Sequence, residues 1–88
     1  MAEQKSEMQV CYARYFVGAH RIEAELFAQP DGMDVRYQMT LIQESERVTC
    51  DLGTCQNAAK QLFLRVVYGG VSACTLQDVV EDYMGTIF

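Results

Sequence analysis

The stretch T-L-Q-D-V-V-E-D-Y-M, residues 75–84, describes a whole amphipathic helix together with its starting signal. Thr75 can accept a hydrogen bond from the backbone N–H three residues on, and Asp78 suits the positive end of the helix dipole. Apolar residues recur at helical spacing on the other side, at Leu76, Val79, Val80, Tyr83 and Met84. Because such a face must be covered, the chain is expected to form a small packed domain.

A second helical pattern precedes this one, over residues 55–68, with Thr54 as its expected N-cap. Gly69 and Gly70 should end it, because glycine readily adopts the left-handed conformation that terminates helices. Gly85 is expected to end the final helix in the same way. The earlier helix has a broad apolar stripe, formed by Ala58, Ala59, Leu62, Phe63, Val66 and Val67.

Before the helices the apolar pattern has a period of two, which is typical of half-buried strands. Four strands are predicted, at residues 8–17, 21–29, 34–43 and 47–52. The Ala, Glu and Leu content of the second stretch would also suit a helix. Pro30-Asp31-Gly32 predicts a hairpin turn, because proline presets the first turn dihedral and glycine accepts a positive one.

The fold class expected from these elements is α+β, in a single domain over residues 1–88. A four-stranded antiparallel meander at residues 8–52 should be followed by a two-helix segment at residues 54–85, packed on one face of the sheet. Half of the residues are hydrophobic, which is enough for a core, and only the polar residues 1–7 are expected to be disordered.

The net charge is -5, from seven Lys and Arg against twelve Asp and Glu. An acidic chain repels phosphate backbones and anionic lipid, and its arginines are scattered along the sequence. Nucleic acid and membrane are therefore not expected as partners. The polar opening run A-E-Q-K-S-E does not resemble an export signal, so a cytoplasmic location is expected.

Three features of the C-terminal half occur together: Tyr37 on a strand, the D-x-x-T helix entry of Asp51 and Thr54, and the closing signature L-x-D-V-V-E-D-Y-M over residues 76–84. In these features the chain resembles a small domain family of unknown function from anaerobic Gram-positive bacteria of the Firmicutes type. The resemblance covers a little over half of the chain, and it implies no activity, cofactor or catalytic residue.

The search for chemistry finds no nucleophile elbow, zinc-protease motif or glycine-rich phosphate loop, so no enzyme and no cofactor is expected. The cysteines have long, irregular gaps with no C-x-x-C pair, and His20 is the only histidine. One alternative stays open, a small-ligand or metal-binding domain that uses His20 and the four cysteines Cys11, Cys50, Cys55 and Cys74 in a cleft between the sheet and the helices.

The favoured function is a non-catalytic protein-interaction or regulatory module that self-associates. The first strand has large apolar groups on both faces. Two helices are not expected to cover all of them, which indicates a homodimer or another protein partner. Asp78, Glu81 and Asp82 lie on neighbouring parts of one helix surface, as either a solvated side or a site for a basic partner. The possible interaction surface comprises Tyr12, Tyr15, Phe16, Phe27, Tyr37, Asp78, Glu81 and Asp82.

Overall fold

The computed structural model describes the backbone of residues 8–87 and the side chains of residues 8–82. Three predictions lie outside the described parts. They are the disorder of residues 1–7, the tail at residue 88, and the apolar orientation of Tyr83 and Met84. The elements are, in chain order, β1 (Met8–Val17), β2 (His20–Asp31), β3 (Asp34–Gln43), β4 (Glu46–Gly53), α1 (Gln56–Gly69), the short 3-10 helix η1 (Ala73–Thr75) and α2 (Leu76–Ile87).

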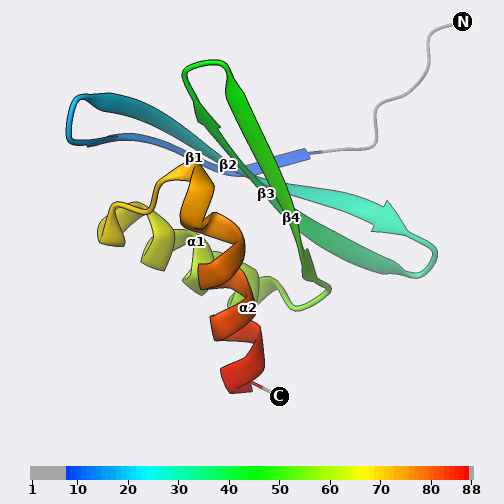
Figure 1. The fold of residues 1–88 in the computed structure, drawn as a ribbon. Helices are drawn as coiled ribbons and strands as arrows, with labels where there is room; N and C mark the ends of the chain where they lie inside the picture. Colours follow the sequence, from blue (N-terminus) through cyan, green and yellow to red (C-terminus); the bar gives the residue numbers. More distant parts are fainter. Residues whose placement is uncertain (1–7, 88) are drawn as a thin grey trace, which may run out of the picture.

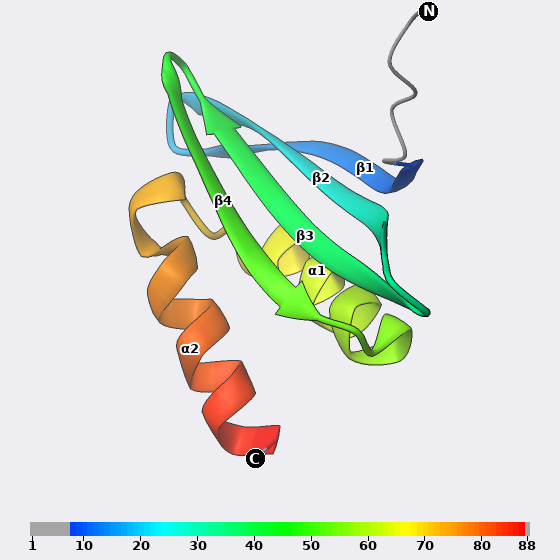
Figure 2. The same cartoon turned by 90° about the vertical axis from the view of Figure 1, so that its right-hand side faces the viewer.

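The four strands form one sheet in the order β1-β2-β3-β4, and every neighbouring pair is antiparallel. Both helices lie on the same side of this twisted sheet, with α1 crossing beneath the strands and α2 running beside β4 (Figures 1 and 2). The predicted α+β class, a meander followed by two C-terminal helices, is confirmed. The sheet therefore has a helix-covered face and an open face.

Each hairpin is closed by a loop of two residues, and the first loop residue has a positive φ in all three. The values are 63° at Gly18, 65° at Gly32 and 57° at Glu44. A positive φ at this position suits the right-handed twist of the flanking strands. Glu44 adopts it without the freedom of glycine, so the third loop carries backbone strain.

The second hairpin is confirmed, but its turn lies later than predicted. Pro30 and Asp31 belong to β2, where they pair with Val35 and Asp34 of β3. Proline is tolerated there because β1 begins with Met8 opposite Ala28, so within residues 8–87 the backbone of β2 has no strand partner on that side beyond Ala28. The helical alternative for residues 21–29 is wrong, because this stretch pairs with strands on both sides.

The core forms between the covered face and the two helices. Ile22, Met39 and Leu41 from the sheet and Val66 from α1 are completely buried. The predicted stripe of α1 is confirmed, because Ala59, Leu62, Phe63 and Val66 are its buried residues. The other buried hydrophobic residues are Ala24, Leu26, Tyr37, Leu52, Ala73, Leu76 and Val80.

Both predicted N-caps are wrong. The residue before α1 is Cys55, and its side chain makes no capping hydrogen bond. Thr75 lies inside η1, where its hydroxyl donates to the backbone oxygen of Ser72 at 3.2 Å. Since η1 continues directly into α2, the chain enters its helical conformation at Ala73, two residues before the predicted cap and directly after the extended Ser72.

The glycine stop of α1 is confirmed, and that of α2 is wrong. Gly70 has a φ of 64°, and the N–H of Val71 reaches back to the oxygen of Val66 at 3.2 Å, which satisfies the end of α1. In contrast, α2 continues through Gly85 to its end. One glycine inside a helix costs only about 1 kcal/mol, which does not stop it.

Candidate functional site

The aromatic side chains of β1 divide between the two faces of the sheet. Tyr12 and Phe16 lie on the open face and are 45% and 68% exposed. Tyr15 lies on the covered face, where its hydroxyl donates to the backbone oxygen of Val71 at 2.6 Å. Partial burial raises the pKa of Tyr15 to about 12. Tyr15 therefore holds β1 to the segment between the helices and is not one of the aromatic residues of the open face.

The remaining two predicted aromatic residues also separate. Phe27 lies on the open face, partly buried, with Gln38 opposite it on β3. Tyr37 is only 7% exposed and belongs to the core, so its assignment to an interaction surface is wrong. The aromatic part of the predicted surface is thus reduced to three residues on the open face, Tyr12, Phe16 and Phe27.

The two outer strands of the sheet differ in how well their edges are protected against pairing with another strand. Along β1 the only charged residue is Arg14, and three of the seven exposed large hydrophobic side chains among the described residues belong to this strand: Met8, Tyr12 and Phe16. Along β4 there are three charged residues, Glu46, Arg47 and Asp51, and α2 runs beside it (Figure 2). Charged side chains on an outer strand disfavour edge pairing with apolar strands. The edge of β1 has fewer of them than the edge of β4.

Four of the five arginines, scattered in the sequence, lie on the open face, one on each strand: Arg14, Arg21, Arg36 and Arg47. Their common face was not predicted from the sequence. The alternation of each strand contained the signal, because every one of these arginines falls on the side opposite to the apolar core positions.

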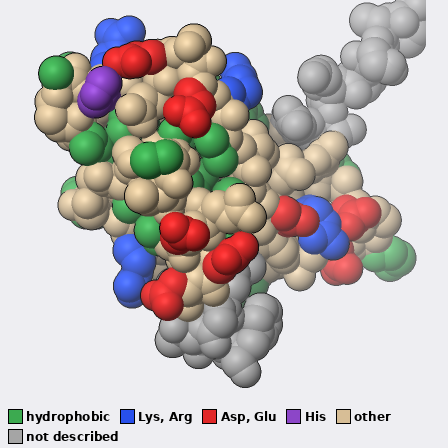
Figure 3. Space-filling view, viewed as in Figure 1, with side chains coloured by type: hydrophobic (Ala, Val, Ile, Leu, Met, Phe, Trp, Pro, Cys, Tyr) green, Lys and Arg blue, Asp and Glu red, His purple; other side chains and the backbone are tan. Residues whose placement is uncertain are grey.

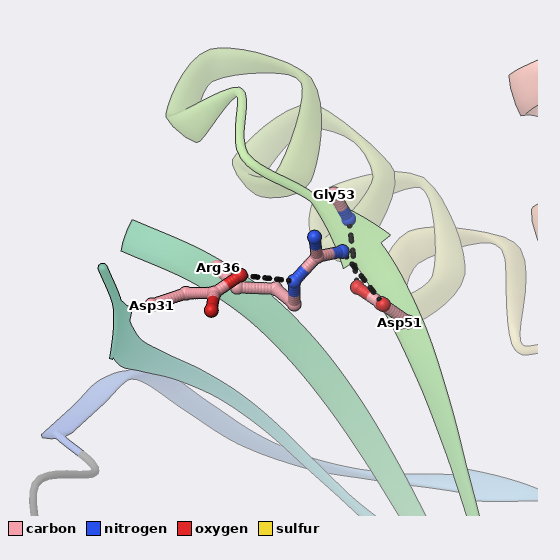
Figure 4. Close-up of polar contacts among 4 residues, drawn as sticks. All are labelled: Asp31, Arg36, Asp51 and Gly53. Carbon is pink, nitrogen blue, oxygen red and sulfur yellow. Dashed lines mark hydrogen bonds and ion pairs between the residues drawn. The ribbon is translucent and has the colours of Figure 1, made fainter. Parts of the chain in front are cut away.

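Arg36 joins the outer ends of three strands (Figure 4). Its Nε donates to Asp31 at 3.1 Å and its Nη1 donates to Asp51 at 2.9 Å. The hydrogen bond that Asp31 accepts, together with the charge of Asp51, raises the pKa of the Arg36 guanidinium. Asp51 also accepts the N–H of Gly53 at 3.0 Å, so this network orders the exit from β4.

The other end of the open face contains a shallow hollow of about 310 Å³, lined by Ala19, Arg21, Glu23, Ile42 and Glu44. Beside it, the Nδ1 atom of His20 lies 2.6 Å from the Oε2 atom of Glu44, which links the first and third hairpin loops. Glu23 and Glu25 lie among the arginines of this face, opposite Arg14 and Tyr12. The face is therefore mixed in charge, unlike the continuous basic surfaces that bind phosphate backbones.

The cysteines and His20 do not converge. Cys11 lies on β1, Cys50 on β4, Cys55 before α1 and Cys74 in η1. Among the described residues no group of three His, Cys, Asp or Glu side chains is placed to hold a metal ion. Burial, with a smaller effect of Glu81, raises the pKa of the Cys50 thiol and so disfavours the reactive thiolate. The alternative of a cysteine and histidine site gains no support from this arrangement.

Acidic side chains gather over α2, as Figure 3 shows. Asp78, Glu81 and Asp82 are all exposed, and Asp78 lies in the first turn of the helix as predicted. Gln77 donates to Glu81 at 3.2 Å. Between this helix and β4 lies a second hollow of about 300 Å³, lined by Thr49, Cys50, Asp51, Gln77, Val80 and Glu81.

Within residues 8–87, no helix is both long enough and apolar enough to cross a membrane. Comparisons with protein-family models, with curated proteins and with solved structures each give no match. The resemblance of the C-terminal half to a Firmicutes-type family therefore stays a prediction.

Proposed function

We propose that this chain is a non-catalytic protein-interaction module that self-associates through β1. The observation that carries the proposal concerns this strand: within residues 8–87 it pairs only with β2, and large apolar side chains are exposed along its length. An unpaired strand presents a row of free backbone N–H and C=O groups to another strand. A second copy offers the same groups in a complementary arrangement.

The side chains of β1 favour one register for such a pair. In an antiparallel pair about a two-fold axis, residues on the same face oppose each other. A register centred on Arg14 would place two like charges directly opposite, which is destabilising. A register centred on Ala13 places Arg14 opposite Tyr12 of the second copy, twice, and a guanidinium beside an aromatic ring is a favourable contact.

The backbone of β1 is regular where this register needs it. The bulge in the pairing of β1 with β2 falls between Gln9 and Cys11, outside the central ladder of residues 11–15. In the register centred on Ala13, Cys11 would oppose Tyr15 on the covered side. The two meanders would then form one continuous sheet, in which neither copy of β1 is an edge.

Light scattering across a dilution series tests the proposal. The wild-type protein should have twice the mass of the 10.0 kDa chain. Tyr12→Lys should give a monomer, because the new charge would oppose Arg14 of the second copy, while within its own chain it lies opposite Glu25. The matched control is Thr49→Lys, an exposed residue on the same face of the other outer strand, and it should leave the dimer intact.

Two results would contradict the proposal. A wild-type mass of one chain at every concentration would exclude self-association. Equal dissociation of the Tyr12→Lys and Thr49→Lys variants would mean that the contact does not use β1.

A further inference from the structure

The second hollow lies at the free edge of β4 and not on a face of the sheet. Thr49 and Asp51 point to the open face, whereas Cys50 points to the covered face. Consecutive residues of a strand can line one hollow only where that hollow lies along the strand's edge. The opposite wall is formed by Gln77, Val80 and Glu81 of α2. We call this hollow the β4–α2 groove.

The two walls of the β4–α2 groove match in length. Residues 49 to 51 span about 6.6 Å at the rise of a strand. Residues 77 to 81 span about 6 Å at the rise of a helix, and Figure 2 shows α2 running beside β4. The groove therefore has a strand edge with unpaired backbone groups on one side and one helical turn on the other.

The lining of the β4–α2 groove combines an apolar base with acidic rims. Val80 is only 6% exposed, and Cys50 is partly buried beside the core. Glu81 forms one rim, and Asp51, which is already paired with Arg36, forms the other. None of the six lining residues is basic. Asp78 and Asp82 add negative charge on the neighbouring turns of α2.

We propose that the β4–α2 groove binds an extended peptide segment with lysine or arginine side chains, which adds to β4 as a further strand. Backbone pairing with the free edge would supply affinity, and alternate side chains would supply specificity, as in other strand-addition complexes. A basic side chain that points toward α2 can lay its aliphatic stem over Val80 and place its charge at Glu81. The charge of the groove selects this class of partner over an acidic one.

This inference does not depend on self-association, because β1 and β4 are opposite edges of the sheet. The probe is a short synthetic peptide of alternating lysine and valine, titrated into the labelled protein and followed by amide chemical shifts. The largest shifts should fall on residues 49–51 and 77–81. A peptide of alternating glutamate and valine should not bind.

Two protein variants separate the groove from general attraction to an acidic chain. Glu81→Lys should weaken binding about tenfold, since reversing one charge contact changes the free energy of binding by about 1.4 kcal/mol. Asp34→Lys makes the same change of charge at an exposed residue beside the second hairpin loop and should leave the affinity nearly unchanged. Peptides with N-methyl groups on alternate amides test the backbone pairing, because only one of the two methylation patterns should abolish binding.

The remaining results overturn the proposal. They are no binding of the basic peptide, equal binding of the acidic peptide, equal weakening by Glu81→Lys and Asp34→Lys, or shifts that fall on β1. Repeating the titration with Tyr12→Lys distinguishes the two edges. Unchanged binding supports the β4–α2 groove, and lost binding would assign the peptide to β1.

Discussion

Replacing Tyr15 by phenylalanine tests how β1 is held to the helices, because this change removes only the hydroxyl group. That hydroxyl donates to the backbone oxygen of Val71 at 2.6 Å, in the segment between α1 and η1. A hydrogen bond of this kind contributes about 1 kcal/mol to stability. Near neutral pH, the Tyr15→Phe variant should therefore unfold with a free energy about 1 kcal/mol below that of the wild type.

The same deficit should disappear at alkaline pH. Burial raises the pKa of Tyr15 from 10.0 to about 12, so the folded state favours the neutral phenol. The stability from this preference is fully present below the unfolded pKa and is lost as the pH rises toward the folded one. The shift corresponds to at most about 2.7 kcal/mol, and the partial exposure of Tyr15 reduces this to roughly 1 to 2 kcal/mol. Phenylalanine does not titrate, so the two stabilities should converge or cross.

Urea unfolding followed by circular dichroism, at a series of pH values from about 8 to 12, measures this difference. Tyr12→Phe is the matched control, because Tyr12 lies on the same strand but is 45% exposed on the open face. It should change stability little at any pH. A Tyr15→Phe deficit that stays constant or grows with pH would refute the reasoning, and so would an equal effect of Tyr12→Phe.

Two further predictions concern the third hairpin loop and α1. Glu44→Gly should raise the free energy of unfolding by about 0.5 to 1 kcal/mol, because it relieves a left-handed residue at a φ of 57° and loses only an exposed contact with His20. Ser45→Gly is the control and should give no gain. Equal stabilisation of both variants in thermal unfolding would contradict the proposed strain. Leu62→Ala should cost about 2 to 5 kcal/mol in chemical denaturation, because Leu62 is 1% exposed. Leu64→Ala, at a residue that is 48% exposed, should cost less than about 0.5 kcal/mol, and similar losses would mean that the buried side of α1 is assigned wrongly.

Much of the fold could be predicted because the pattern of apolar residues is regular. The predicted bounds of the first and third strands agree with β1 and β3, and the apolar stripe over residues 58–67 is the side of α1 that packs on the sheet. The ends of elements were harder, since they depend on local competition. Pro30 could join β2 because the described pairing with β1 reaches only to Ala28, and the entry to α2 moved back because η1 precedes it.

The candidate sites depend on three-dimensional arrangement that alternation alone does not give. Alternation shows which residues share a face, but it does not show which face the helices cover, so Tyr37 was placed on a surface although it lies in the core. The common face of the four arginines could have been found by applying the same alternation to charged residues. The β4–α2 groove could not, because it requires α2 to lie beside β4, and the pattern of the helix does not give that position.

The order of elements along the chain has a consequence for protein synthesis. The ribosome releases the whole meander before either helix, so a nascent chain that ends at residue 53 has no cover for the side of the sheet that contains Leu26, Met39 and Leu41. Such a chain exposes this apolar layer until residues 54–87 emerge. A fragment that stops within α1 should therefore be insoluble and recruit chaperones, because its sheet lacks the helices that cover it.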